Sequence, residues 1–261
     1  MTSLMLKEAL SAGDCVAGQL AQDAERYAEL GRLLRSTSIN SALTIARGSS
    51  DHAASYCAYL TMARMGRIVA SLPMSLVTLY KSPLVTRDTL TIAISQSGQS
   101  PDVVEPTQYF RAGGATTVAL VNDTTSPLAQ AAEWTMPLHA GKEQSVAATK
   151  SFIASLVAGA RLVANWQQDA ELLDGLAALP DALRAAATAD WSAALEVLTP
   201  ARNIMVVGRG ISFPVALEAA LKFKETSALQ AEAFSGAEIK HGPMALIEEG
   251  YPLMIFATRG P

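Results

Sequence analysis

The chain changes its pattern of hydrophobic positions near residue 40. Residues 3–35 place apolar side chains such as Tyr27 and Leu30 at helical spacing, with charged residues between them. From about Ala42 onward, short apolar runs alternate with helical stretches. This alternation predicts an α/β fold with a parallel sheet and crossover helices, preceded by an N-terminal helical arm over residues 1–40.

Five apolar runs after the arm predict one complete sheet. The predicted strands cover residues 42–46, 68–72, 90–94, 116–121 and 134–138. The predicted helices cover residues 51–65, 101–112, 127–132 and 146–166. These elements form a doubly wound unit over residues 41–167, followed by an alanine- and leucine-rich helical connector over residues 168–200.

The strand, turn and helix pattern then begins again. The predicted elements are a strand over residues 203–207, a helix over 214–228 and a strand over 253–257. Gly48 and Gly98 are 50 positions apart, and Gly208 and Gly260 are 52 apart. We therefore predict two doubly wound units in tandem, with the second, residues 201–261, truncated after its third strand.

Composition favours a compact protein and excludes several kinds of partner. Half of the residues are hydrophobic, and the net charge of −4 gives no general attraction for nucleic acid or an anionic membrane. The longest apolar stretch, residues 152–166, contains Arg161 and is shorter than the roughly 20 residues that span a bilayer. Cys15 and Cys57 match neither a metal site nor a disulfide framework. We expect a cytoplasmic protein with two free thiols, no metal and no cofactor.

A serine-rich turn follows the buried run at residues 91–94. It reads Ser95, Gln96, Ser97, Gly98, Gln99 and Ser100. In parallel sheets, ligands gather at the carboxyl ends of strands, where the next helix presents the positive end of its dipole. Pro101 suits the first helical position and Ser100 the N-cap. The turn predicts a phosphate site, and the alternative is an ordinary turn whose serines cap the helix.

A second hydroxyl-bearing turn, Arg47 to His52, follows the first strand. Crossover topology should bring the two turns to one edge of the sheet. The alternative is that Ser50 or Asp51 only caps the following helix.

Titratable residues also gather in the second unit. Glu218, Lys222 and Glu225 lie at i, i+4 and i+7 of the predicted helix, a spacing that also fits a solvated row of salt bridges. His241 lies in a turn, and imidazole exchanges protons near neutral pH. His52 and His139 are expected to be structural.

Together these segments resemble the SIS (sugar isomerase) family, specifically tandem-SIS proteins related to the isomerase half of glucosamine-6-phosphate synthase. The resemblance runs from about residue 41 to the end. The segments that carry it are Gly48–Ser50, Ser95–Ser100, Ser145–Lys150, Val207–Gly210, Ala220–Glu225 and Glu238–Pro243.

The resemblance implies a role for each matching residue. The residues that match its phosphate and sugar contacts are Gly48, Ser50, Ser95, Gln96, Ser97, Ser100 and, through its backbone, Val146. Glu225 matches the base that moves a proton between C1 and C2 of the open-chain sugar, and Lys222 a residue that assists it. His241 matches the ring-opening histidine, which in synthase relatives comes from the partner subunit. A homodimer with a shared active site is therefore implied.

Two departures from the synthase pattern refine the expected reaction. Thr2 follows Met1, and nothing resembles the glutaminase domain with its N-terminal cysteine. The C-terminal tail, with a lysine that contacts the sugar, has no counterpart either, so phosphate binding is more secure than catalysis. We expect an enzyme that converts glucosamine-6-phosphate to fructose-6-phosphate and ammonia.

Other reactions and one other class of protein remain open. A synthase-type isomerase domain, a simple aldose-ketose phosphate isomerase, a galactosamine-6-phosphate deaminase and a deglycase are alternative enzymes. A non-catalytic sugar-phosphate sensor is the alternative class.

Overall fold

The computed structural model describes residues 3–258 and divides the chain into two units, Met1–Ala187 and Thr188–Pro261. Each unit contains its own parallel sheet, which confirms the predicted α/β fold. Gly260, one of the four glycines behind the predicted repeat, lies outside the described residues. Among residues 3–258, no helix is both long and apolar enough to cross a membrane.

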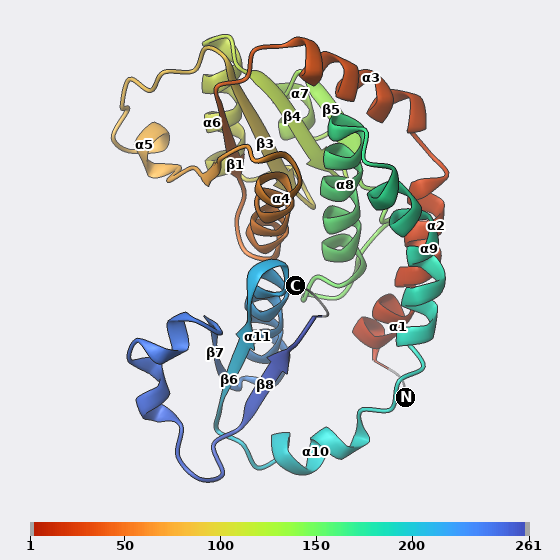
Figure 1. Ribbon diagram of the computed structural model, residues 1–261, viewed down its shortest axis with the longest axis vertical. Helices are drawn as coiled ribbons and strands as arrows, with labels where there is room; N and C mark the ends of the chain where they lie inside the picture. The colour runs from red at the N-terminus through yellow and green to blue at the C-terminus, as the bar shows by residue number, and fades with distance from the viewer. Residues whose placement is uncertain (1–2, 259–261) are drawn as a thin grey trace. The chain divides into compact units, whose positions relative to one another are not determined.

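The first unit is built on a five-stranded parallel sheet. Its strands are β1 (Ser41–Ile45), β2 (Val69–Ser71), β3 (Thr89–Ser95), β4 (Thr116–Val121) and β5 (Trp134–Pro137), in the order β2-β1-β3-β4-β5 (Figure 1). All five predicted strands are confirmed to within one or two residues. The strand order reverses between β1 and β3, so the crevice outside their carboxyl ends is where such a sheet binds ligands.

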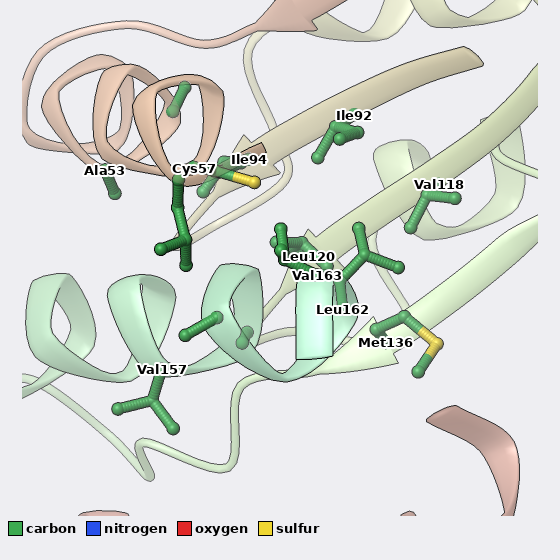
Figure 2. Close-up of a cluster of buried hydrophobic side chains, with 14 of the residues drawn as sticks. Ala53, Cys57, Ile92, Ile94, Val118, Leu120, Met136, Val157, Leu162 and Val163 are labelled. Carbon is green, nitrogen blue, oxygen red and sulfur yellow. The ribbon is translucent and has the colours of Figure 1, made fainter. Parts of the chain in front are cut away.

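Helices cover both faces of this sheet (Figure 1). The helices on one face are α4 (Ser49–Met65) and α8 (Lys150–Gln167), and those on the other are α5 (Ser75–Thr78), α6 (Pro101–Ala112) and α7 (Pro127–Ala131). Successive residues of β3 point to opposite faces of the sheet. Ile92 and Ile94 belong to the core under α4 and α8 (Figure 2), whereas Ala93 belongs to the core on the other face. Burial on both sides explains the continuous apolar runs of these strands.

A further helical layer packs on α8. It consists of α2 (Ala12–Leu20), α3 (Ala24–Ser36) and α9 (Ala170–Ala186), and α1 (Leu4–Leu10) packs on α2. Arg161 of α8 is buried here and donates to the carbonyl oxygens of Gln19 at 2.9 Å and Gln22 at 2.7 Å. Its guanidinium lies 4.1 Å from the centre of the Tyr27 ring. Arg161 therefore satisfies the C-terminal end of α2 from inside the core.

The predicted helix over residues 146–166 begins later than expected, at Lys150. The Glu143 carboxylate accepts the backbone N–H of Thr149 at 2.8 Å and of Ser151 at 3.3 Å, and it also bonds both hydroxyls. A carboxylate at this position satisfies the free N–H groups of the first turn and complements the helix dipole. Residues 146–149 are therefore loop, and the prediction for them was wrong.

The second unit carries a three-stranded parallel sheet in the order β7-β6-β8. Its elements are α10 (Ser192–Leu198), β6 (Asn203–Gly208), α11 (Phe213–Ser227), β7 (Gln230–Ser235) and β8 (Leu253–Phe256), with 3₁₀ turns at Gly210–Ser212, Glu238–Lys240 and Pro243–Leu246. The expected strands and helix are confirmed, whereas β7 was not predicted. A small core forms between Ile204 and Val206 of β6, Ala216 and Ala220 of α11, and Ala231 of β7.

Candidate functional site

The serine-rich turn at the end of β3 is fixed by its own hydrogen bonds. The Ser95 hydroxyl accepts the backbone N–H of Gly98 at 2.9 Å, and the Gly98 carbonyl accepts the N–H of Leu128 at 3.1 Å. Gly98 has φ +64°, in the left-handed region that favours glycine. These bonds hold the backbone of the turn, and with it the serine hydroxyls, in one defined arrangement.

The serine hydroxyls keep their donor capacity for a ligand. Ser100 is at the N-cap position of α6 and is followed by Pro101, yet its hydroxyl makes no capping bond. The oxygens of Ser95 and Ser97 accept backbone N–H groups within the turn, the second at a longer 3.4 Å, which leaves both hydroxyl hydrogens to be donated. The alternative in which Ser100 caps the helix through its hydroxyl is therefore wrong.

The turn after β1 begins α4 in an unexpected way. Gly48, with φ +55°, is the N-cap residue, and its carbonyl accepts the N–H of Asp51 at 2.9 Å and of His52 at 3.2 Å. Ser50 lies in the first helical turn, so neither Ser50 nor Asp51 is the N-cap. The capping alternative therefore does not account for the Ser50 hydroxyl.

The two turns are neighbours, as predicted. β1 pairs directly with β3, with Ile45 opposite Ala93. An ion pair of 3.1 Å between Arg47 and Asp102 then joins the β1 turn to the first turn of α6. Both side chains are exposed, so this pair indicates proximity more than stability.

A cavity of about 570 Å³ borders the β3 turn at the same edge of the sheet. The residues that line it are Gln22, Gln96, Ser97, Gln99, Asn122, Asp123, His139, Gly141 and Lys142. Asn122 and Asp123 follow β4, and His139 follows β5, so the strand-end rule could have found them in the sequence. The Nε2 atom of His139 lies 2.5 Å from a carboxylate oxygen of Asp23.

The loop between β5 and α8 carries Val146. Its side chain is fully exposed, with a relative accessible surface of 101%, whereas Ala147 and Thr149 beside it are buried. In the part of the chain that the structure describes, neither the N–H nor the carbonyl of Val146 makes a hydrogen bond within the protein. The backbone of Val146 is thus available to a ligand.

In the second unit, the three charged residues of α11 form one cluster. The Nζ atom of Lys222 lies 3.1 Å from Oε1 of Glu218 and 2.5 Å from Oε2 of Glu225. Glu218 is 5% exposed, the Lys222 side chain 17% and the Glu225 side chain 33%. Two members of this row of ion pairs, Glu218 and Lys222, are therefore withdrawn from water, whereas Glu225 is exposed. The Glu225 carboxylate is therefore accessible to a ligand and is also paired with the Lys222 ammonium group.

His241 lies on the segment between β7 and β8, just after the 3₁₀ turn Glu238–Lys240. Its backbone N–H donates to the Glu238 carbonyl at 2.8 Å, and the residue is exposed. Across residues 3–258, no group of three or more His, Cys, Asp or Glu side chains is arranged to hold a metal ion.

The first unit is thus a doubly wound α/β domain with a hydroxyl-rich turn at its strand-order reversal, the place where this class of fold binds its ligands. Comparison with known sequences then identifies the family, because the SIS domain profile matches residues 37–164 and 197–261. The chain belongs to the SIS domain family. Its sequence is also homologous to the isomerase domain of glucosamine-fructose-6-phosphate aminotransferase.

Three relatives illustrate this similarity. The glutamine-fructose-6-phosphate aminotransferase [isomerizing] of Zymomonas mobilis is 34% identical over 230 residues, which cover 83% of the chain and 37% of that enzyme. A crystal structure from Silicibacter pomeroyi DSS-3, assigned as a phosphosugar isomerase, superposes with a TM-score of 0.94 at 41% identity, over 98% of this chain and 78% of that one. The C-terminal domain of glucosamine-fructose-6-phosphate aminotransferase from Francisella tularensis gives 0.80 at 25% identity, over 98% and 76%. The chain spans about two fifths of the length of the curated relatives it matches.

Proposed function

We propose that this protein is a sugar-phosphate isomerase that acts on an amino-sugar phosphate, converting glucosamine-6-phosphate and water to fructose-6-phosphate and ammonia. The observation that carries the proposal is the β3 turn, where Ser95, Ser97 and Ser100 hold hydroxyl donors for which residues 3–258 provide no recorded acceptor. These donors, with Ser50 and Gln96, suit a phosphate monoester at the strand-order reversal. Membership of the SIS family and similarity to an aminotransferase of the isomerizing type support a phosphorylated sugar as the ligand.

The proposed chemistry assigns the proton transfer to the second unit. After His241 assists ring opening, Glu225 removes the proton from C2 of the open-chain sugar and returns it to C1. The C1 carbonyl oxygen gains a proton and becomes a hydroxyl, while the C2 amine loses one N–H proton and becomes an imine. Water then adds to C2 of the imine, the C–N bond breaks, and ammonia leaves with a ketone at C2. Lys222 stabilises the negative charge that develops on the sugar oxygens during the transfer.

A panel assay tests the proposal. The protein is incubated with glucosamine-6-phosphate, galactosamine-6-phosphate and a fructosamine phosphate, and ammonia and ketose phosphate are measured. We expect turnover of a hexosamine-6-phosphate that falls at least about 100-fold in Glu225→Gln. Glu196→Gln, which changes an exposed glutamate of α10, should leave the rate unchanged. Absence of turnover with every amino-sugar phosphate would refute the reaction.

A synthase-type reaction is the second candidate, because the curated relatives at 30–37% identity are glutamine-fructose-6-phosphate aminotransferases. Fructose-6-phosphate supplied with ammonia would then give glucosamine-6-phosphate as the favoured product. A simple aldose-ketose isomerase would interconvert sugar phosphates without releasing ammonia. Binding of a sugar phosphate without any turnover would instead indicate a sensor.

The shared site of a homodimer is a further part of the proposal. If His241 acts from the partner subunit, mixing inactive His241→Ala and Glu225→Gln proteins should restore up to about a quarter of the wild-type activity in the hybrid population. Mixtures that stay inactive although the subunits exchange would contradict a shared site.

The tandem arrangement of two similar units is also part of this proposal. The order β7-β6-β8 in the second unit repeats the order β2-β1-β3 of the first, which supports a tandem arrangement. The description of residues 1–40 as an arm, the predicted unit boundaries, the cytoplasmic location and the lack of a nucleic-acid partner stay predictions.

A further inference from the structure

Helix α1 buries a charged residue and exposes leucines, the reverse of what is expected for a helix that only packs against the protein. It exposes Leu4, Leu6 and Leu10, and its single buried residue is Glu8, which is 7% exposed. Apolar side chains normally face the protein and glutamate is almost never buried without partners. A break in this rule points to a role for the carboxylate other than packing.

The Glu8 carboxylate is directed at the loop between β5 and α8. It accepts the backbone N–H of Gln144 at 2.7 Å and of Ser145 at 3.1 Å, and it also accepts the Ser145 hydroxyl. Hydrogen bonds to an ionised carboxylate are stronger than neutral ones. These bonds, led by that of the Ser145 hydroxyl, lower the pKa of Glu8, so the group is ionised at neutral pH.

A second carboxylate holds the other end of the same loop. Glu143 bonds Thr149 and Ser151, so the segment is fixed at residues 144–145 by one glutamate and at residues 149–151 by the other. Val146 lies between the two anchors, with an exposed side chain and peptide groups that bond nothing within the described protein. The two N–H groups that precede Val146 point toward Glu8, so the backbone that leads into Val146 is held from α1.

We propose that Glu8 is a positioning residue that orients the Val146 backbone toward the sugar portion of the bound sugar phosphate. This inference rests on the proposed function, in which the Val146 backbone contacts the sugar. Glu8 touches no substrate itself. It prepares the loop so that the sugar contact forms without reordering the backbone, whereas the phosphate is held independently by the β3 turn.

The test compares two ligands that share only the phosphate. In Glu8→Gln, an amide nitrogen replaces one acceptor oxygen and faces backbone donors. We expect the Kd of glucosamine-6-phosphate to rise roughly tenfold by calorimetry, while the Kd of inorganic phosphate stays the same. Deuterium exchange of the amides at residues 144–145 should accelerate by a similar factor. Glu29→Gln, at an exposed glutamate of α3, is the matched control and should change neither quantity.

The possible results distinguish failure of the positioning role of Glu8 from failure of the proposed reaction. Unchanged amide exchange, unchanged sugar-phosphate affinity, or an equal loss for both ligands overturns the positioning role. Wild-type protein that binds glucosamine-6-phosphate no better than inorganic phosphate refutes the sugar contact and therefore the inference, whatever the variants do. Failure of turnover with intact, Glu8-dependent sugar binding refutes only the proposed reaction. If Glu8→Gln does not fold, Ser145→Ala removes one donor and should give a smaller loss of about threefold with the same selectivity for the sugar ligand.

Discussion

Replacing Gly98 with alanine tests whether the β3 turn has the geometry described. A Cβ atom at this position would lie 2.2 Å from Oγ and 2.6 Å from Cβ of Ser126, and 3.0 Å from a methyl carbon of Val121. Ser126 is buried, and its hydroxyl caps α7 by accepting the N–H of Ala129 at 3.3 Å. The serine therefore cannot rotate away without losing that cap, and the turn itself must move.

Gly66 offers a matched control for the backbone. It has φ +63°, against +64° for Gly98, and no atom lies within 4 Å of the position that a Cβ would take there. Alanine in the left-handed region costs about 1–2 kcal/mol, which is the whole expected effect of Gly66→Ala. Gly98→Ala adds overpacking of about 1–3 kcal/mol, so we expect a total loss of about 2–5 kcal/mol.

Urea denaturation followed by tryptophan fluorescence measures both losses, because Trp166 is fully buried in the first unit. Gly98→Ala should also weaken phosphate binding, since the Gly98 N–H holds the Ser95 hydroxyl in place, whereas Gly66→Ala should not. Losses of stability that agree within about 0.5 kcal/mol, or unchanged phosphate affinity in Gly98→Ala, would refute the reasoning.

Three further predictions concern buried and ionised groups. Arg161→Met removes the hydrogen-bond donor to the carbonyl oxygens at the end of α2. The free energy of unfolding, measured by urea denaturation, should fall by about 2–4 kcal/mol. Burial raises the pKa of Cys57 to about 12, so at pH 8 a thiol reagent should modify it only after unfolding, later than the half-buried Cys15. The pKa of Glu8 is lower in the folded protein than in the unfolded chain. Ionised Glu8 therefore stabilises the folded state at pH values above the ordinary glutamate pKa, and this stabilisation is lost as the pH falls through the pKa of the folded state. The Tm difference between wild type and Glu8→Gln should therefore shrink in acid.

The sequence allowed most of the first sheet to be predicted because its strands are buried on both faces. Strand β7 was missed because Gln230–Ser235 mixes alanine with polar residues and lies at a sheet edge. The start of α8 was misplaced for a different reason. Val146 to Ala148 have small or apolar side chains that suit a helix, and only the bonds from Glu143 reveal where the helix begins.

Residues of the candidate site could be predicted from the sequence where polar side chains lie at the end of a predicted strand. Ser95 and Ser97 could be selected because they lie at the end of β3 and just after it, and the same rule applied to β4 and β5 would have added Asn122 and His139. Glu8 gave no such signal, because it lies 136 positions before the loop that it holds. Such a partner becomes visible only when the fold brings the two segments together.

The charged cluster of α11 shows why spacing alone could not decide between surface and site. Glu218, Lys222 and Glu225 would have the same spacing in a solvated row, and what differs is that Glu218 and Lys222 are withdrawn from water. If Glu225 is the base, it becomes neutral when it takes the proton from the sugar. Lys222 would then lose its 2.5 Å ion pair with Glu225, and loss of a charged partner is costly for a largely buried ammonium group. In that proposed mechanism Glu218, whose Oε1 atom lies 3.1 Å from Nζ of Lys222, would remain a charged partner of the ammonium group and would reduce this cost.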